Sequence, residues 1–209
     1  MRQLNISSIL GILVVTFINL LLEILKTNPS IRIISGSNKG FKINFRPSSK
    51  LRPTSDRLKK IAFDWMQFNI LDSNCLDLFA GTGSLGLECL SRSASKVTFV
   101  DHTKDHINKI NKLTGELNYK DKCECIRADV SAWMHGNEEV FDLIFMDPPY
   151  EFIDYEILLE TIALNKMLSK NGFIFLEHAA RISINIPDTL KAIREKKVGE
   201  AKGQLIQWK

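Results

Sequence analysis

Residues 77–88 read DLFAGTGSLGLE and carry the clearest fold signal in the sequence. This stretch follows a short apolar run and leads into a segment with helical periodicity, so it predicts a turn between a buried strand and a helix. Gly81, Gly83 and Gly86 have the G-x-G-x-x-G spacing, which lets a ligand lie against the backbone near a helix N-terminus. The next strand is expected to end at Asp101, where a carboxylate can accept both hydroxyl protons of a ribose.

The glycine pattern alone fits either a dinucleotide or S-adenosylmethionine, and a glycine-rich turn with no ligand is the simpler alternative. Asp77 separates the two ligands, because it lies four residues before Gly81 at the end of the expected strand. An acid there can face a cationic amino-acid group, but it would repel a pyrophosphate. The sequence therefore favours S-adenosylmethionine.

Beyond this stretch, short apolar runs alternate with helical stretches. Strands are expected at 75–79, 96–101, 123–127, 141–147 and 172–177, with a closing antiparallel pair near 194–198 and 204–209 around a turn at 199–203. Such alternation is typical of an α/β fold whose parallel sheet is covered by helices on both faces. We predict a Rossmann-like domain over residues 71–209, with a seven-stranded, mostly parallel sheet.

A basic segment precedes this domain. Residues 1–60 hold 11 Lys and Arg against 2 Asp and Glu, a net charge of +9, whereas residues 61–209 carry a net charge of −5. Residues 31–70 predict a β-hairpin, with strands at 31–35 and 41–45, a basic loop and then a helix through Phe68. The cations fit a phosphate backbone, and a solvated face is the alternative. The candidate ligands are Arg32, Lys39, Arg46, Arg52 and Arg57, surrounded by Lys42, Lys50, Lys59 and Lys60.

A second motif, FDLIFMDPPY at residues 141–150, decides the chemistry. Two consecutive prolines cannot continue a central strand, so they predict a rigid turn directly after Asp147. Asp147 and the carbonyl of Pro148 can each accept one hydrogen of a planar exocyclic amine, whose lone pair then faces an electrophile. Tyr150 offers a face on which a base can stack. A purely structural strand-ending turn is the alternative.

Together, these two motifs and Asp101 resemble the class I S-adenosylmethionine-dependent amino-methyltransferases, whose D-P-P-Y tetrapeptide occurs in enzymes that methylate adenine N6 and guanine N2. A narrower resemblance is to the RsmD family. It rests on IRIISG (31–36), LRPTSDR (51–57), LDLFAGTGSLGLE (76–88), DPPY (147–150) and the tail VGEAKGQ (198–204). The resemblance implies a class I methyltransferase that transfers a methyl group from S-adenosylmethionine to the N2 amine of a guanine in 16S ribosomal RNA.

The resemblance also implies a role for each motif residue. The cofactor residues would be Asp77, Phe79, Gly81, Gly83 and Gly86, with Asp101 at the ribose and Asp129 at the adenine amine. The catalytic residues would be Asp147, Pro148 and Tyr150, which hold the guanine, and the basic segment would bind the RNA. Asp129 has a second interpretation as the N-cap of the following helix.

Two other functions stay open. A DNA adenine-N6 methyltransferase shares D-P-P-Y but generally carries a large target-recognition region, and only about 60 residues follow Tyr150. A non-catalytic RNA-binding assembly factor would not need both motifs intact. The expected partner is 16S ribosomal RNA or the assembling 30S subunit, and the chain is expected to act as a cytoplasmic monomer.

Residues 1–30 have no counterpart in the resemblance. Residues 9–22 are almost wholly apolar but shorter than the roughly 20 residues that a membrane span needs. An appended helix, a weak membrane anchor through residues 9–25 and a cleaved signal are the three interpretations. Four cysteines without a C-x-x-C pair predict reduced thiols and no metal, and His102 with His106 is the alternative metal pair.

Overall fold

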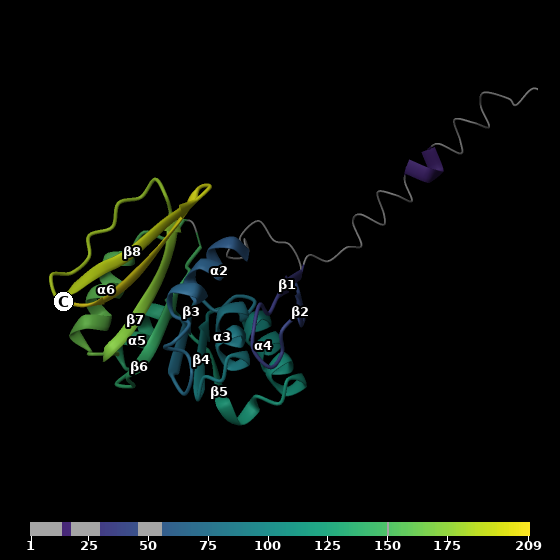
Figure 1. Cartoon of the computed structure of the whole chain (residues 1–209), viewed down its shortest axis with the longest axis horizontal. Helices are drawn as coiled ribbons and strands as arrows, with labels where there is room; N and C mark the ends of the chain where they lie inside the picture. Colours follow the sequence, from purple (N-terminus) through teal and green to yellow (C-terminus); the bar gives the residue numbers. More distant parts are fainter. Residues whose placement is uncertain (1–13, 18–29, 46–55, 150) are drawn as a thin grey trace, which may run out of the picture.

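The computed structural model describes residues 14–17, 30–45, 56–149 and 151–209 (Figure 1). Its centre is a sheet of the strands β3 (Asn74–Leu78), β4 (Lys96–Asp101), β5 (Cys123–Arg127), β6 (Phe141–Met146), β7 (Leu168–Ala179), β8 (Leu190–Val198) and β9 (Ala201–Trp208). The strand order is β5-β4-β3-β6-β7-β9-β8. The first five strands in this order run parallel, and β9 and β8 close the sheet as an antiparallel pair. This arrangement confirms the predicted Rossmann-like α/β fold with seven strands.

Helices cover both faces of the sheet, as expected. They are α2 (Asp56–Trp65), α3 (Ser84–Ser91), α4 (Lys104–Glu116), α5 (Val130–His135) and α6 (Tyr155–Leu164), with a short 3-10 turn at Lys120–Lys122 before β5. In β6, Leu143 and Phe145 face the core beneath α2, α3 and α4, while Ile144 and Met146 face the core beneath α5 and α6. Near-continuous apolar strands therefore bury both of their faces, as parallel sheets require.

The basic segment begins with the predicted hairpin, formed by β1 (Ser30–Arg32) and β2 (Lys42–Asn44). Ile33 and Ile43 are buried in the same core as α2 and α3. Gly36 has φ +83° because its turn approaches α3 so closely that a Cβ atom would lie 1.8 Å from the carbonyl oxygen of Ser91. The hairpin and the sheet domain thus share one core.

The expected end of the first helix is wrong. α2 ends at Trp65, and the chain then turns through a hydrogen bond from the Asn69 N–H to the Met66 carbonyl, 2.8 Å long. This turn brings Ile70 into the core, whereas Phe68 is 90% exposed and contributes nothing to it.

The closing strands are longer than expected. β7 begins at Leu168, β8 at Leu190 and β9 at Ala201, so the turn between the last two strands is only Gly199-Glu200. Gly203, expected in that turn, lies inside β9 instead. A Cβ atom there would stand 3.1 Å from both Leu58 of α2 and Phe175 of β7, so the absent side chain lets α2 pack closely on the sheet.

Among the first 29 residues, only 14–17 are described, and they are helical. The interpretations of residues 9–25 therefore lie outside the described residues. Within the described part of the chain, no helix is both long and apolar enough to span a membrane.

Candidate active site

The candidate site lies at the carboxyl ends of the parallel strands. The loop after β3 is built from left-handed residues, with φ of +62° at Phe79, +53° at Gly81 and +74° at Gly83. Gly83 caps α3, and a Cβ atom there would lie 2.9 Å from Ile110 of α4. Glycine is therefore needed at Gly83 for both the backbone conformation and the space. The loop places the N-terminus of α3 at the strand ends, where an anionic or polar ligand group can meet free N–H donors.

Asp101, at the end of β4, holds this loop in place. Its carboxylate accepts hydrogen bonds from the Gly81 N–H (2.8 Å) and the Thr103 N–H (2.7 Å), and it meets Nδ1 of His106 at 3.1 Å. Burial alone would raise the pKa of Asp101, but these three hydrogen bonds outweigh it and hold the pKa below its usual value. Asp101 is therefore an anion beside the glycine loop, which is the place predicted for a ribose ligand.

Asp77 lies underneath the same loop. Its Oδ2 accepts a hydrogen bond of 2.9 Å from the Gly86 N–H of α3, and the side chain is buried. Burial is the main reason that its pKa rises to about 8, and the negative charges of Asp147 and Asp101 add to the rise. A carboxyl group in this state favours the arrival of a cation, as expected for the methionine end of the cofactor.

Gly86 was predicted as a cofactor residue, and its geometry favours a packing role. A Cβ atom at this position would lie 2.2 Å from the ring of Phe99 in β4, so only glycine lets α3 lie against the sheet. This is the helix–strand function of the third glycine in such loops.

Asp147 follows β6, next to β3 and β7 in the sheet. Met146 pairs with Leu176 of β7, so the next residues in the two strands, Asp147 and Glu177, lie in one row. Side chains alternate along strands, and Phe175 faces the core beneath α2 and α3. Asp147 and Glu177 therefore point to the same face as Asp77. The negative charge of Asp147 contributes to the raised pKa of both Asp77 and Glu177.

Glu177 is the site residue that the sequence reasoning missed. It is only 4% exposed, and its Oε2 has no hydrogen-bond partner among the residues that the structure describes. Burial, with a smaller contribution from the charge of Asp147, raises the pKa of Glu177 to about 9. The available signal was the alternation in β7, which places residue 177 in phase with Phe175 at the end of a buried strand.

Aromatic rings join the two motif loops. Phe79 of the glycine loop packs edge to face on Phe152, which follows the D-P-P-Y turn, with ring centroids 5.1 Å apart. Phe152 packs in the same way on Tyr155 at the start of α6, again at 5.1 Å. The turn itself is closed by a 2.8 Å hydrogen bond from the Phe152 N–H to the Pro149 carbonyl. These contacts fix Asp147 and Pro148 relative to the loop after β3.

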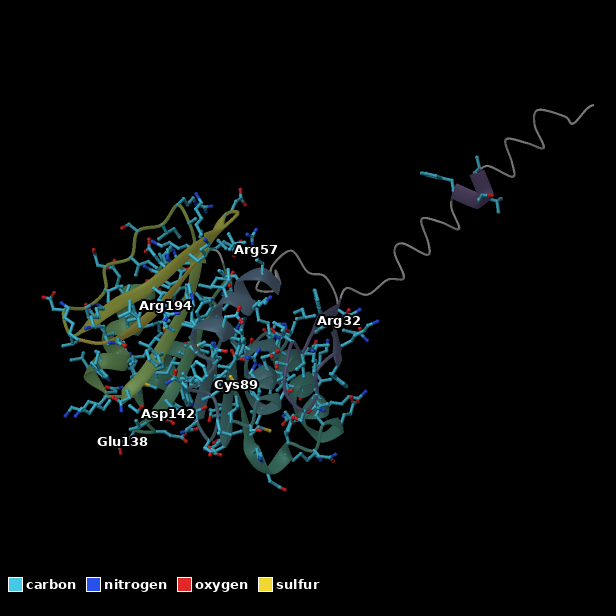
Figure 2. The ribbon with its side chains drawn as sticks, in the orientation of Figure 1. Arg32, Arg57, Cys89, Glu138, Asp142 and Arg194 are labelled. Atoms are coloured by element: carbon cyan, nitrogen blue, oxygen red, sulfur yellow. The ribbon has the colours of Figure 1, made fainter. Side chains whose placement is uncertain are left out.

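The basic residues are spread over a wide surface. Arg32 and Lys39 of the hairpin and Arg57 of α2 are exposed, and Figure 2 shows Arg57 between Arg32 on one side and Arg194 on the other. The prediction that Lys59 belongs to the exposed RNA-binding cations is wrong, because its side chain is fully buried and its ammonium lies 3.2 Å from the carboxylate of Glu88. The predictions for Tyr150, Arg46 and Arg52 lie outside the described residues.

Asp129 and the histidines complete the list of candidates. Asp129 caps α5, since its Oδ1 accepts a 3.0 Å hydrogen bond from the Ala132 N–H, and its side chain is exposed. This is the second of its two predicted roles. His102 is exposed and His106 contacts Asp101, and the described residues include no cluster of three or more His, Cys, Asp or Glu that could hold a metal ion.

Comparisons with known proteins agree with this geometry. The family model described as Conserved hypothetical protein 95 matches residues 31–207. The ribosomal RNA small subunit methyltransferase D of Haemophilus influenzae is 35% identical over 184 residues, which cover 85% of this chain and 93% of that protein. The protein of the same name from Escherichia coli K12 is 31% identical over 181 residues, or 85% of this chain and 89% of that protein.

Solved structures show the same fold. The protein yhhF of Escherichia coli, described as a candidate methyltransferase, superposes with a TM-score of 0.79 at 27% identity, covering 87% of this chain and 99% of that chain. The chain thus has the class I methyltransferase fold. It belongs to the Conserved hypothetical protein 95 family, together with the ribosomal RNA small subunit methyltransferase D proteins.

Proposed function

We propose that this protein transfers a methyl group from S-adenosylmethionine to the exocyclic N2 amine of a guanine in 16S ribosomal RNA. The observation that carries the proposal is the placement of Asp147 and Pro148. They follow β6 directly, beside the glycine loop after β3, where a bound base would meet a bound methyl donor. The relatives named ribosomal RNA small subunit methyltransferase D support a small-subunit rRNA substrate.

The acids at this edge fit a cationic cofactor. S-adenosylmethionine carries a sulfonium and an ammonium group and supplies an electrophilic methyl group when bound. Asp77 and Asp101 flank the loop, and a buried carboxyl oxygen of Glu177 accepts no hydrogen bond from any described residue. An uncompensated acidic site of this kind favours a ligand that brings positive charge. Phe79 and the glycines would line the cofactor through their backbone.

The residues of the turn would orient the base. The two hydrogens of the guanine amine would be accepted by Asp147 and by the Pro148 carbonyl, which leaves the nitrogen lone pair directed at the methyl donor. Tyr150 would stack on the base. As the nitrogen–carbon bond formed, the methyl–sulfur bond of the donor would break and leave S-adenosylhomocysteine, and Asp147 or water would accept the extra proton of the amine. No strong general base is required, because the methyl donor is already a reactive electrophile.

The guanine must leave its stack to reach this turn. Exposed cations such as Arg57 would hold the surrounding phosphates, while the chain acts as a cytoplasmic monomer on 16S RNA or on the assembling 30S subunit.

The proposal is tested by transfer of a radiolabelled methyl group from S-adenosylmethionine to 16S RNA and, in parallel, to duplex DNA. We expect label in the RNA and none in the DNA, and we expect Asp147→Ala to abolish transfer while it still binds the cofactor. Asp154→Ala, at an exposed aspartate before α6, is the matched control and should transfer normally. Label in DNA adenine would favour the alternative DNA methyltransferase. RNA binding without transfer by the unaltered chain would favour an assembly factor.

A further inference from the structure

The edge strand β8 exposes a row of cations. All seven residues from Lys191 to Lys197 are exposed, although they lie within β8, whose register with β9 shifts between Ala192 and Arg194. Four of the seven are basic, namely Lys191, Arg194, Lys196 and Lys197. The only acid among them, Glu195, forms a 2.8 Å ion pair with Lys202 of β9. Within the described part of the chain, none of the four cations lies within 4.0 Å of a carboxylate oxygen.

The strand register aligns this row with the candidate active site. Lys196 pairs with Gly203 of β9, and Gly203 pairs with Glu177 of β7. Glu177 in turn lies beside Asp147, so the four residues form one line across the sheet. Neighbouring strands are about 4.8 Å apart, which places the backbone of Lys196 about 14 Å from that of Asp147.

Two of the cations belong to the same face as Asp147. Arg194 pairs with Leu205, which is buried in the core beneath α2, and Lys196 pairs with Gly203, whose missing Cβ atom would meet Leu58 of α2. Residues paired across strands share a face, so Arg194 and Lys196 lie on the face that α2 covers.

Helix α2 extends this charge toward the body of the protein. It packs against both β8 and β9, and its Arg57 and Lys60 are exposed. Figure 2 shows Arg57 between Arg194 on one side and Arg32 on the other. The cations of α2 and β8 therefore flank the edge of the sheet at which a base would enter.

We propose that the basic strand β8, with Arg194 and Lys196 at its centre, binds the RNA phosphates next to the methylated nucleotide. This inference rests on the proposed function, since it extends the RNA surface from residues 31–60 to the other end of the chain. Cations on an exposed edge strand can also serve to prevent edge-to-edge association of sheets. If that were their role, removing them would not change the affinity for RNA.

The test compares the full-length chain with the double variant Arg194→Gln/Lys196→Gln by fluorescence anisotropy on a labelled 16S RNA fragment over a range of salt concentrations. We expect the dissociation constant to rise about tenfold at moderate salt. We expect the slope of log K against log salt to become shallower by about 1.5, because each lost phosphate contact contributes about 0.7 to 0.9. The affinity for S-adenosylmethionine should stay the same, which shows that the variant is folded.

Lys122→Gln/Lys170→Gln is the matched control, because both lysines are exposed at the opposite edge of the sheet, where β5 and β7 begin. An equal loss of RNA affinity in this control would overturn the inference, and so would an unchanged salt slope in the β8 variant. Increased aggregation of the β8 variant with unchanged RNA affinity would assign the cations to edge protection. Failure of the unaltered chain to methylate 16S RNA would instead contradict the proposed function, so the two failures are distinguishable.

Discussion

The buried carboxylate of Glu88 ties the basic segment to the methyltransferase domain. Its Oε2 accepts hydrogen bonds from the Ile34 N–H at 2.7 Å and lies 3.2 Å from the ammonium of Lys59. Its Oε1 accepts from the Ser35 N–H at 2.9 Å and from Nε of Arg92 at 2.8 Å. One side chain of α3 thus holds the hairpin, α2 and its own helix together. The Glu88 and Lys59 side chains are fully buried.

Replacing Glu88 with Gln is expected to destabilise the protein strongly. The amide is neutral, so the buried ammonium of Lys59 loses the negative charge of Glu88, and one half of the amide presents N–H groups to existing donors. Removing one partner of a buried ion pair typically costs about 3–5 kcal/mol. We therefore expect Glu88→Gln to lower the free energy of unfolding by about 4 kcal/mol, a large share of the roughly 5–15 kcal/mol of a typical domain.

Urea denaturation followed by circular dichroism measures this loss. Lys59→Met alone should cost about 1–3 kcal/mol, because Arg92 and the two N–H groups still hold the carboxylate. The double variant should cost less than the sum of the single variants by at least about 1 kcal/mol, as expected for residues in direct contact. Lys60→Met, at an exposed neighbour, should cost less than about 0.5 kcal/mol. A loss below about 1 kcal/mol for Glu88→Gln, or full additivity with Lys59→Met, would show that Glu88 and Lys59 do not stabilise the fold as a buried pair.

Three further predictions concern the site. Burial raises the pKa of Glu177 from its usual 4.5 to about 9. Between these pH values the native state holds a proton that the unfolded chain releases, so the free energy of unfolding should fall as the pH rises. Glu177→Gln should reduce the slope of the unfolding free energy against pH by the equivalent of up to one proton, as measured in thermal unfolding scans from pH 5 to pH 9. An unchanged slope would show that Glu177 is ionised at neutral pH. Gly86→Ala should cost at least about 1–3 kcal/mol in urea denaturation, because the new methyl group would overlap the ring of Phe99, whereas Gly136→Ala meets no atom within 4 Å. Equal costs for these two variants would contradict the packing role. Asp129→Ala should lower the free energy of unfolding by about 1 kcal/mol through loss of the α5 cap, and a fall in cofactor affinity beyond this would support its other predicted role.

The sequence predicted the parts of the fold that depend on local signals. The glycines of the loop after β3 need positive φ or close packing, and the strand before them is short and apolar, so both are visible in a single stretch. The acid at Asp101 was found because it ends the next strand. The mostly parallel sheet with helices on both faces followed from the regular alternation of strands and helices.

Features that depend on distant pairing were not predicted. Glu177 lies beside Asp147 because β7 pairs with β6, and the alternation in β7 gives its face but not its neighbour in the next strand. Lys59 belongs to a basic run and was grouped with the RNA-binding cations around it. Its position on the buried face of α2 instead brings its ammonium to Glu88. The end of α2 was missed because no Gly or Pro follows Trp65 directly, and the chain turns to bury Ile70.

The most direct test of the proposed function is mass spectrometry of the nucleosides from 16S RNA that has been incubated with the protein and S-adenosylmethionine. We expect N2-methylguanosine at one position, formed by the unaltered chain and absent with Asp147→Ala. Methylation at adenine N6, or guanine methylation that persists in Asp147→Ala, would contradict the assignment of Asp147 and Pro148 to the guanine amine.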